Sequence, residues 1–404
     1  MDAKSIGNTI AELRKKSGFT QIDLAQKLGI SSKTVSKWEN GNGYPDIVFF
    51  PKLASLFGVS IDHLMLGEKK GIAIAGNLIA DIIKNINTYP KESMMSYVGD
   101  ISCAVGGCVP NTAINLAKID RSIPLHAYGK VGTDQNGHYI VSELIKNGIN
   151  TDGICYTPLT PTSFCDVLNS SSGERTFFHK KGANAEFCPD DIALDTLDCS
   201  IFHIGYILLL DMFDAKDKEY GTVMARFLHS LQKRGIKTSI DVVSDDTADY
   251  GRYIIPALKY CNYTVMNETE CCRTFNMEAY DKSGKLDVES IKAAMKKQVE
   301  CGVSDKVIVH CKRAAFILDS KTLEFNHLAS LDIPKSEIKG SVGAGDAFCA
   351  GCLYGIYNEL SDTQLLEFAI AAASCSLFAA NSIDGMQQKN VVMQLNEKYK
   401  RMSI

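Results

Sequence analysis

The sequence predicts an all-α helix-turn-helix domain followed by an α/β domain with a mainly parallel sheet, helices on both faces and a small β lid. Three observations support this fold class. The chain has 404 residues, more than one ordinary core needs. Residues 1–70 show helical apolar spacing interrupted by glycine turns. From about residue 200, short apolar runs alternate with amphipathic segments, which is typical of βαβ units.

The composition is that of a folded, water-soluble protein. Hydrophobic residues make up 45% of the chain and charged residues 22%, which argues against a disordered protein. No segment approaches the roughly 20 apolar residues that a membrane span needs, and no apolar run follows the N-terminal charges. The fourteen cysteines are scattered without paired C-x-x-C sets, so we interpret them as buried thiols. These features predict a cytoplasmic protein without membrane attachment.

Charge is distributed unevenly along the chain. The formal net charge is -4, yet residues 1–70 hold ten Lys and Arg against seven Asp and Glu, leaving about -7 for the rest. Any nucleic-acid surface is therefore expected in the N-terminal part.

The N-terminal part reads as helix, glycine turn, helix. Apolar positions with helical spacing begin at Ile6, and Thr20 and Ser31 are suitable caps for two further helices, separated by Gly29. The third helix leaves short polar or basic side chains outside, which suit a major groove. We expect DNA contacts from Ser32, Lys33, Ser36 and Lys37 on that helix, and a phosphate contact from Gln21 on the helix before it.

This region resembles the helix-turn-helix of phage-repressor-like (Xre-type) transcription regulators. The resemblance rests on the sequence above together with Trp38-Glu39-Asn40-Gly41, Pro45 and the run from Phe57 to Leu64. It implies binding to a double-stranded DNA operator as a two-fold dimer. We expect this domain over residues 1–67, a linker over 68–70 and the larger domain over 71–404. So short a linker favours communication between the two domains.

The larger domain opens with a buried strand over residues 71–76. Asp81 follows in an expected loop at its carboxyl end, where open α/β sheets place ligands. Farther along, Gly106 and Gly107 allow the backbone to approach a polyol, and Asn111 offers a donor and an acceptor to hydroxyls.

A glycine-rich turn near the C-terminus leads into a helix. Gly343 and Gly345 lack the Cβ that keeps backbone N–H groups away from an anion, and the helix that follows directs its positive end to the same place. Asp346 lies in the first turn of this helix, where a carboxylate can accept a proton from an attacking hydroxyl. The sequence alone is also compatible with an ordinary helix cap behind a flexible turn.

The motifs over 106–113 and 340–346 together closely resemble the two signatures of the PfkB (ribokinase-like) family of carbohydrate kinases. The resemblance covers about residues 71–404 and implies transfer of the ATP γ-phosphoryl group to a sugar or nucleoside hydroxyl. It further implies that Asp346 is the base, that the amides of Ala344, Gly345 and Asp346 form the anion hole behind the turn glycine Gly343, and that Asp81, Gly106, Gly107 and Asn111 hold the substrate. Asn267 and Glu270 match the family's N-x-x-E, which implies Mg²⁺ held through Glu270 and water rather than by a site made only of protein ligands.

Other segments support the same arrangement. β-like runs at about 97–105 and 162–180, with a hairpin turn at 170–173, predict a lid that in relatives can be a dimer surface. The run over 129–137 is interpreted as a structural turn. Alternating elements are expected as strands 201–210, 237–243, 263–266, 307–310 and 316–318, with helices over 218–233 and 288–300 between them.

Two departures from the family pattern bear on function. Gly340-Ser341 stands where the family usually has Asp-Thr, which puts a monovalent cation in doubt. The segment from His310 to Ala315 lacks the family's glycines, and Lys312 or Arg313 is a candidate to replace backbone contacts to ATP by charge.

Three functions remain open from the sequence. The first is a carbohydrate kinase fused to a DNA-binding module, acting as a sugar-responsive regulator. The second is a non-catalytic sugar or nucleoside sensor that regulates transcription, favoured by the two departures but opposed by the retained Asp346. The third is an enzyme whose helical module serves only for dimerisation.

Overall fold

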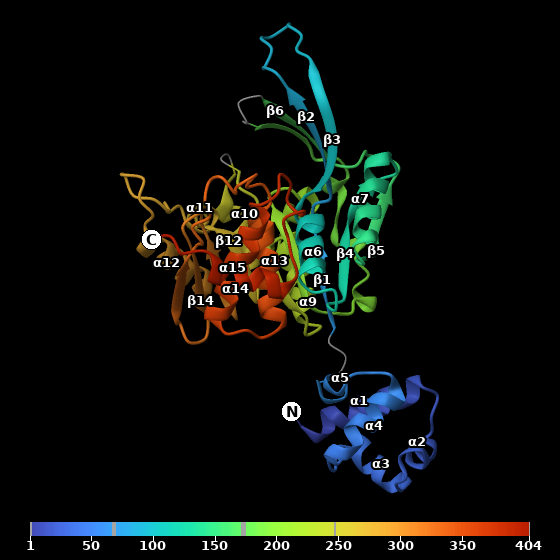
Figure 1. Ribbon diagram of the computed structural model, residues 1–404. Helices are drawn as coiled ribbons and strands as arrows, with labels where there is room; N and C mark the ends of the chain where they lie inside the picture. Colours follow the sequence, from blue (N-terminus) through green and yellow to red (C-terminus); the bar gives the residue numbers. More distant parts are fainter. Residues whose placement is uncertain (1, 67–69, 171–174, 246–247, 404) are drawn as a thin grey trace. The chain divides into compact units, whose positions relative to one another are not determined.

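The computed structural model describes residues 2–66, 70–170, 175–245 and 248–403 (Figure 1). Its contacts divide the chain into two units, one up to Lys70 and one from Gly71 onward. Most of the expected linker, residues 68 and 69, and most of the expected hairpin turn, residues 171–173, lie outside the described residues.

The N-terminal unit is helical, and local caps fix its helices. The side chain of Thr20 caps α2 reciprocally with Asp23, and Gly29 ends that helix at φ +70°. Arg14 forms a largely buried ion pair with Glu39 at 2.6 Å, which ties the first helix to the third. The elements are α1 Ala3–Lys16, α2 Gln21–Leu28, α3 Ser32–Glu39, a 3-10 turn Ile47–Phe49, α4 Phe50–Phe57 and α5 Ile61–Leu66.

The larger unit is built on a nine-stranded sheet in the order β15-β14-β13-β12-β11-β8-β1-β4-β5. All neighbours are parallel except β13–β14 and β14–β15, so the mainly parallel sheet is confirmed. The strands are β1 Gly71–Ala75, β4 Leu125–Gly132, β5 Asn150–Thr157, β8 Cys199–Ile207, β11 Lys237–Val242, β12 Tyr263–Asn267, β13 Lys306–His310, β14 Ala314–Asp319 and β15 Phe325–Ala329.

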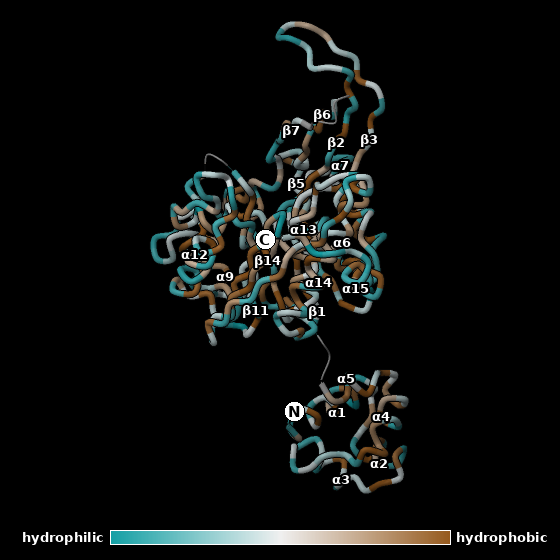
Figure 2. Tube along the Cα trace, turned by 60° about the vertical axis from the view of Figure 1, so that its left-hand side comes forward, coloured by the Kyte–Doolittle hydropathy of each residue, from teal (hydrophilic) through white to brown (hydrophobic). Residues whose placement is uncertain are grey.

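Helices cover both faces of this sheet because its central strands are apolar on both sides. In β1, Ile72 and Ile74 face one core, while Ala73 and Ala75 face the other. The first core takes α6 Cys108–Ile119, α7 Gln135–Lys146, α13 Ala344–Tyr357, α14 Asp362–Ser376 and α15 Lys389–Lys398. The second takes α8 Asp211–Asp214, α9 Val223–Gln232, α10 Tyr250–Leu258, α11 Glu268–Arg273 and α12 Val288–Cys301. Hydrophilic segments gather at the periphery, as around α12 in Figure 2.

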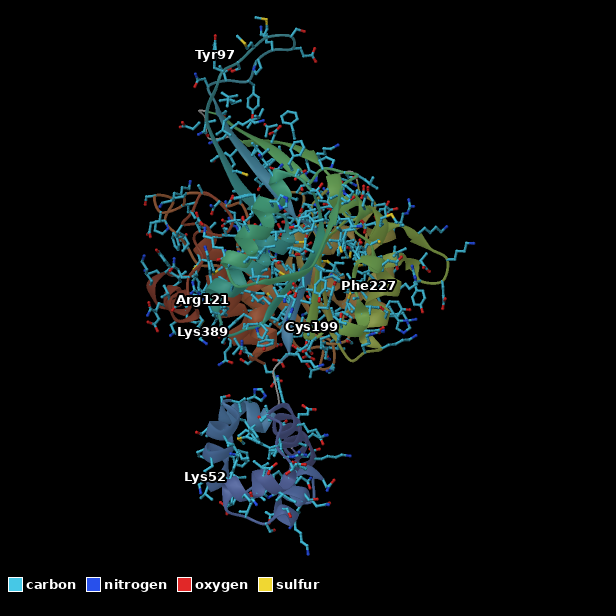
Figure 3. All side chains as sticks on the ribbon, turned by 90° about the vertical axis from the view of Figure 1, so that its right-hand side faces the viewer. Lys52, Tyr97, Arg121, Cys199, Phe227 and Lys389 are labelled. Carbon is cyan, nitrogen blue, oxygen red and sulfur yellow. The ribbon has the colours of Figure 1, made fainter. Side chains whose placement is uncertain are left out.

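A second sheet forms the expected lid, in the order β3-β2-β6-β7. Its strands are β2 Ile79–Ile86, β3 Val98–Gly106, β6 Phe164–Ser170 and β7 Arg175–Lys180. The β2–β3 hairpin projects from the body of this unit, and Figure 3 labels Tyr97 on it. The sequence interpretation missed β2. Asp81, expected in a loop, lies inside this strand and pairs with Ala104 and Cys165, because β2 obtains its partners from distant segments.

The helix expected over 218–233 begins only at Val223. Residues Lys216–Asp217 and Gly221–Thr222 instead pair as the short strands β9 and β10, and the Thr222 side chain caps the helix. The strand expected to reach residue 210 ends at Ile207. Among the described helices, none combines the length and apolar character that crossing a membrane requires.

Candidate active site

The glycine turn before α13 has a conformation that requires glycine at its central position. Gly343 is the N-cap, with φ +77°, and a Cβ there would stand 2.1 Å from the Cβ of Ser382. No side chain caps α13, in contrast to α2, where Thr20 does so. The first-turn amides of Ala344, Gly345 and Asp346 therefore meet no capping side chain, as an anion hole requires, although the Ala344 N–H donates to the Ser341 carbonyl oxygen at 3.4 Å.

The Asp346 carboxylate is buried at this helix end, with 5% of the residue exposed. The amide nitrogen of Asn111 donates to Oδ2 at 2.8 Å, and the Tyr206 hydroxyl lies 3.0 Å from both carboxylate oxygens. Burial, followed by the nearby Asp241 charge, raises the pKa of Asp346 to about 7, although these two hydrogen bonds act in the opposite direction. A carboxyl group with such a pKa is well matched to general-base chemistry at neutral pH.

Two residues hold the partners of Asp346 in place. The Ser382 hydroxyl donates to Oδ1 of Asn111 at 2.7 Å, which fixes the orientation of the amide. The Tyr206 backbone N–H donates to Asp241 at 2.6 Å, and Tyr206 adopts φ +59°, an uncommon value for a tyrosine. The Asn111 side-chain amide, which is expected to bind substrate, thus donates to Asp346 and accepts from Ser382.

The other residues expected to bind substrate come together where β1, β2 and β3 lead into α6. A Cβ on Gly106 would lie 2.5 Å from the Asp81 carboxylate, and one on Gly107 would lie 2.4 Å from the Asn77 carbonyl oxygen. Gly107, at φ +87°, is the N-cap of α6. The Asp81 charge also contributes to the raised pKa of Asp346, so the two groups share one electrostatic environment.

A cavity of about 280 Å³ extends from Asp346 toward the N-x-x-E segment. Asp241, Glu270 and Asp346 all line it, and among the described residues that line it there is no lysine or arginine. Burial and the neighbouring acidic groups raise the pKa of Glu270 to about 8, against the effect of hydrogen bonds from Asn267 and Ser244. Three carboxyl groups without a cationic side chain fit a hydrated divalent cation such as Mg²⁺, which prefers oxygen ligands.

Asn267 and Glu270 are locked together at the start of α11. The side-chain oxygen Oδ1 of Asn267 accepts from the Glu270 backbone N–H at 2.8 Å, while the Glu270 carboxylate accepts from the Asn267 backbone N–H at 2.9 Å. The Asn267 amide nitrogen donates to both Ser244 and Glu270. This reciprocal cap holds the Glu270 carboxylate at the cavity wall, which suits contact with a cation through water.

A second, more apolar cavity of about 530 Å³ lies on the other side of the glycine turn. His310 and Gly345 line both cavities, so the two meet at the first turn of α13. Lys312 lines the second cavity, whereas Arg313 donates to the Ser403 carbonyl oxygen at 3.4 Å. Of the two expected cationic replacements, only Lys312 lines this cavity.

Gly340 provides no side chain near this turn. A Cβ at Gly340 would lie 2.9 Å from the carbonyl oxygen of Ala379, so a carboxylate cannot be added here without a shift of the backbone.

In the N-terminal unit, the third helix presents the expected side chains outward. Lys33 and Lys37 are exposed, and Ser32 and Ser36 are partly exposed. The amide nitrogen of Gln21, expected to hold a phosphate, instead donates to Glu39 at 2.7 Å. Its nitrogen is therefore part of the network that joins α2 to α3.

Sequence reasoning missed Tyr206 and Asp241. Both stand at the carboxyl ends of expected strands, β8 and β11, where open α/β sheets place ligands. Asp241, the one acidic residue in the expected strand over 237–243, was a usable sequence signal. No sequence signal indicated that Tyr206 reaches Asp346.

The sequence of this chain matches models of known protein families. Residues 69–389 match a family model described as pfkB family carbohydrate kinase, and residues 10–64 match one described as helix-turn-helix. A ribokinase of Arabidopsis thaliana is 25% identical over 330 residues, covering 80% of each chain. A 5-dehydro-2-deoxygluconokinase of Geobacillus kaustophilus is 23% identical over 345 residues, covering 81% of this chain and 94% of that protein.

Solved structures show the same fold for the larger unit. Arabidopsis thaliana ribokinase complexed with ribose and ATP superposes with a TM-score of 0.67 at 23% identity, covering 81% of this chain and 98% of that one. A putative ribokinase II from E. coli in complex with ATP and Mg²⁺ gives a TM-score of 0.65 at 17% identity, covering 81% and 99%. The ribokinase-like fold expected from the sequence is confirmed.

Proposed function

This chain belongs to the pfkB family of carbohydrate kinases, and we propose that its larger unit transfers the γ-phosphoryl group of ATP to a hydroxyl of a sugar or sugar-like molecule. The observation that carries the proposal is the position of Asp346, a buried carboxyl group at the positive end of α13, where two cavities meet. This arrangement places a base and an anion site together.

In the proposed reaction, Asp346 accepts the proton of the substrate hydroxyl as its oxygen attacks the γ-phosphorus. The new O–P bond forms while the bond to the β-phosphate oxygen breaks, which releases ADP. The amides of Ala344, Gly345 and Asp346 stabilise the charge on the transferring group. Asp81, Gly106, Gly107 and Asn111 hold the substrate, with Asn111 also orienting the base.

We assign the second cavity to the adenosine part of ATP, because its lining is largely apolar and it adjoins the anion site. Asn267 and Glu270 would hold Mg²⁺ through water at the first cavity. The ion supplies positive charge that neutralises the phosphates. A monovalent cation is not part of the proposal, since Gly340 provides no carboxylate.

The N-terminal unit is a helix-turn-helix domain. We assign it sequence-specific binding to a double-stranded DNA operator through Ser32, Lys33, Ser36 and Lys37, with the protein acting as a sugar-responsive transcription regulator in the cytoplasm. The exposed lysines on α3 support this assignment. Gln21 is placed in a supporting role, because its amide nitrogen binds Glu39.

A homodimer would supply the paired recognition helices that operators require. The lid is the proposed contact surface, because its projecting hairpin exposes several large apolar side chains: Met94, Met95, Tyr97, Val98 and Ile101. Light scattering on the protein and on the Tyr97→Asp, Ile101→Asp double variant tests this. A variant that stays dimeric contradicts the assignment of the surface.

The kinase proposal is tested by ATP turnover with Mg²⁺ across a panel of sugars, sugar phosphates and nucleosides, with Asp346→Asn as the matched variant. Stimulation by one compound that the variant loses by a factor of about 10² to 10⁴ supports a general base. If compounds raise the melting temperature but none stimulates turnover, the unit is a sensor and the kinase proposal is wrong.

The regulator proposal is tested separately. DNA fragments selected from a random pool by the full-length protein are measured for affinity with and without the compound found above. A change in affinity supports coupling between the units. Absence of salt-dependent DNA binding would mean that the helical unit serves another purpose, such as dimerisation.

A further inference from the structure

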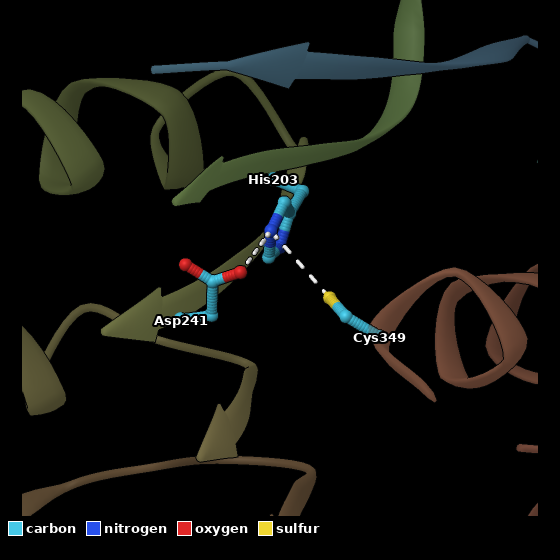
Figure 4. A group of neighbouring side chains, drawn as sticks. All are labelled: His203, Asp241 and Cys349. Atoms are coloured by element: carbon cyan, nitrogen blue, oxygen red, sulfur yellow. Dashed lines mark hydrogen bonds and ion pairs between the residues drawn. The ribbon is translucent and has the colours of Figure 1, made fainter. Parts of the chain in front are cut away.

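Three potential metal ligands from separate elements converge beneath the first cavity (Figure 4). His203 comes from β8, Asp241 from β11 and Cys349 from α13. The Nε2 atom of His203 lies 3.4 Å from an Asp241 carboxylate oxygen and 3.6 Å from the sulfur of Cys349. All three ligand atoms lie within 4.8 Å of one another.

The two separations from Nε2 of His203 match the edges of a tetrahedral zinc site. With the usual Zn–N and Zn–O bonds of about 2.0 Å and Zn–S bonds of about 2.3 Å, ligand atoms around a tetrahedral ion stand about 3.3 to 3.6 Å apart. The two separations from His203 are close to these edges. One nitrogen, one oxygen and one sulfur ligand form a set that suits Zn²⁺ and does not suit Mg²⁺.

The surroundings orient the histidine for this role. Its Nδ1 lies 3.0 Å from the Ser239 hydroxyl, which can accept the Nδ1 proton and leave the Nε2 lone pair facing Asp241 and Cys349. His203 itself is fully buried, so its ring is held by packing as well. Metal-binding histidines commonly have such a second hydrogen bond.

The cluster is also accessible to an ion. Asp241 and Cys349 both line the first cavity, so two of the three ligands can be reached from it, while His203 is fully buried. A water molecule or an anion in the cavity can complete the coordination.

We infer that His203, Asp241 and Cys349 form a binding site for one Zn²⁺ ion, with its fourth position facing the cavity. The site shares the first cavity with the magnesium position assigned to Asn267 and Glu270 and uses the Asp241 carboxyl group that lines that cavity, but it does not depend on the proposed kinase activity. A metal-binding role for Cys349 differs from the expectation from the sequence that the cysteines are only buried thiols.

Zinc here would be connected to the base. Asp241 also accepts the N–H of Tyr206 at 2.6 Å, and the Tyr206 hydroxyl binds Asp346. Tyr206 thus connects the proposed zinc ligand Asp241 to the base Asp346.

The test uses Co²⁺ as a spectroscopic substitute for Zn²⁺ in the full-length protein. Because the other cysteines are potential ligands, accessible thiols are first alkylated, and each variant is titrated with one equivalent of metal in excess Mg²⁺. We expect a thiolate-to-cobalt absorption band and tetrahedral d–d bands in the alkylated protein that carries no substitution. Cys349→Ser should abolish them, and Cys352→Ser, which removes a buried thiol from the same helix, should retain them.

Two further measurements keep the inference falsifiable if Cys349→Ser folds poorly. Ser239→Ala should weaken Zn²⁺ affinity about 10- to 100-fold in a competition titration. Crystals grown with Zn²⁺ should show an anomalous peak between the three side chains. No band in the alkylated protein that carries no substitution, a band that persists in Cys349→Ser, or no peak at this place would establish a simple hydrogen-bonded cluster and overturn the inference.

Discussion

The hydroxyl of Tyr206 lies 3.0 Å from both carboxylate oxygens of Asp346, a residue 140 positions farther along the chain. Burial and the Asp346 charge raise the pKa of the Tyr206 phenol well above its ordinary value, so the phenol stays protonated and donates. Together with Asn111, it stabilises a carboxylate whose burial favours the neutral form. The pKa of the proposed base thus depends on two opposing effects: burial raises it, and the hydrogen bonds from Asn111 and Tyr206 lower it.

Catalysis by this protein should depend on pH through Asp346. Because Asp346 must be ionised to accept a proton and its pKa is raised to about 7, kcat/KM should rise as the pH increases through about 7. Steady-state rates between pH 5 and 9 with saturating Mg²⁺ and ATP measure this. A rate already constant from pH 5 upward would contradict the raised pKa.

The same carboxyl group has a predictable effect on stability. Its folded-state pKa lies above the ordinary value of 3.8, so the stability it contributes is present below pH 3.8 and is lost as the pH rises through about 7. Asp346→Asn should therefore raise the melting temperature more at pH 8 than at pH 5. Equal shifts at both pH values would show that desolvation of the charge is unimportant.

Tyr206→Phe removes a hydrogen bond that favours the ionised base. A hydrogen bond to a charged group contributes roughly 1.5 kcal/mol, so its loss should raise the pKa of Asp346. The rising limb of the pH profile should therefore shift to higher pH by about one unit. The substrate KM should change little. Tyr250→Phe, which removes another largely buried phenol hydroxyl, is the control and should leave the limb in place.

The two glycines of the turn should respond differently to alanine. In Gly343→Ala, the new Cβ would stand 2.1 Å from the Cβ of Ser382, and the alanine would have to adopt a left-handed backbone conformation. This variant should therefore lose both activity and about 1 to 3 kcal/mol of stability. Gly345→Ala has 3.5 Å of clearance from His310. It should fold normally but lower kcat, because its methyl group narrows the anion site. Melting curves and rates distinguish these outcomes, and normal activity in Gly345→Ala would argue against the anion site.

Lys312 and Arg313 form a matched pair for nucleotide binding. Lys312 lines the cavity assigned to adenosine, while Arg313 contacts the Ser403 carbonyl. Lys312→Ala should raise the KM for ATP severalfold, and Arg313→Ala should leave it unchanged. Equal effects of the two variants would place the nucleotide elsewhere.

Lys33 and Lys37 should contribute to DNA affinity by contacting phosphates. Removing one phosphate contact should reduce the slope of log affinity against log salt by about 0.9. Lys52→Ala, an exposed lysine on α4, is the matched control because it removes the same charge from another helix of the domain. If it weakens binding as much as Lys33→Ala, α3 is not the recognition helix.

Features that depend on neighbouring residues could be predicted from the amino-acid sequence. The caps at Thr20 and Ser31, the turn at Gly29 and the glycine turn before Asp346 are local, and each lies where it was expected. The alternation of strands and helices was sufficient for the parallel sheet. The substrate and magnesium roles of individual residues stay predictions.

The surroundings of Asp346 and the pairing of distant segments depend on how the chain packs in three dimensions. β2 became a strand because β3 and β6 supply its hydrogen-bond partners, which no local pattern around Asp81 shows. Likewise, Tyr206, Asp241 and Cys349 lie on three separate elements and meet only when β8, β11 and α13 pack together. Short-range propensity specifies helices, turns and caps, whereas the pKa of a buried group depends on contacts between residues that are far apart in the chain.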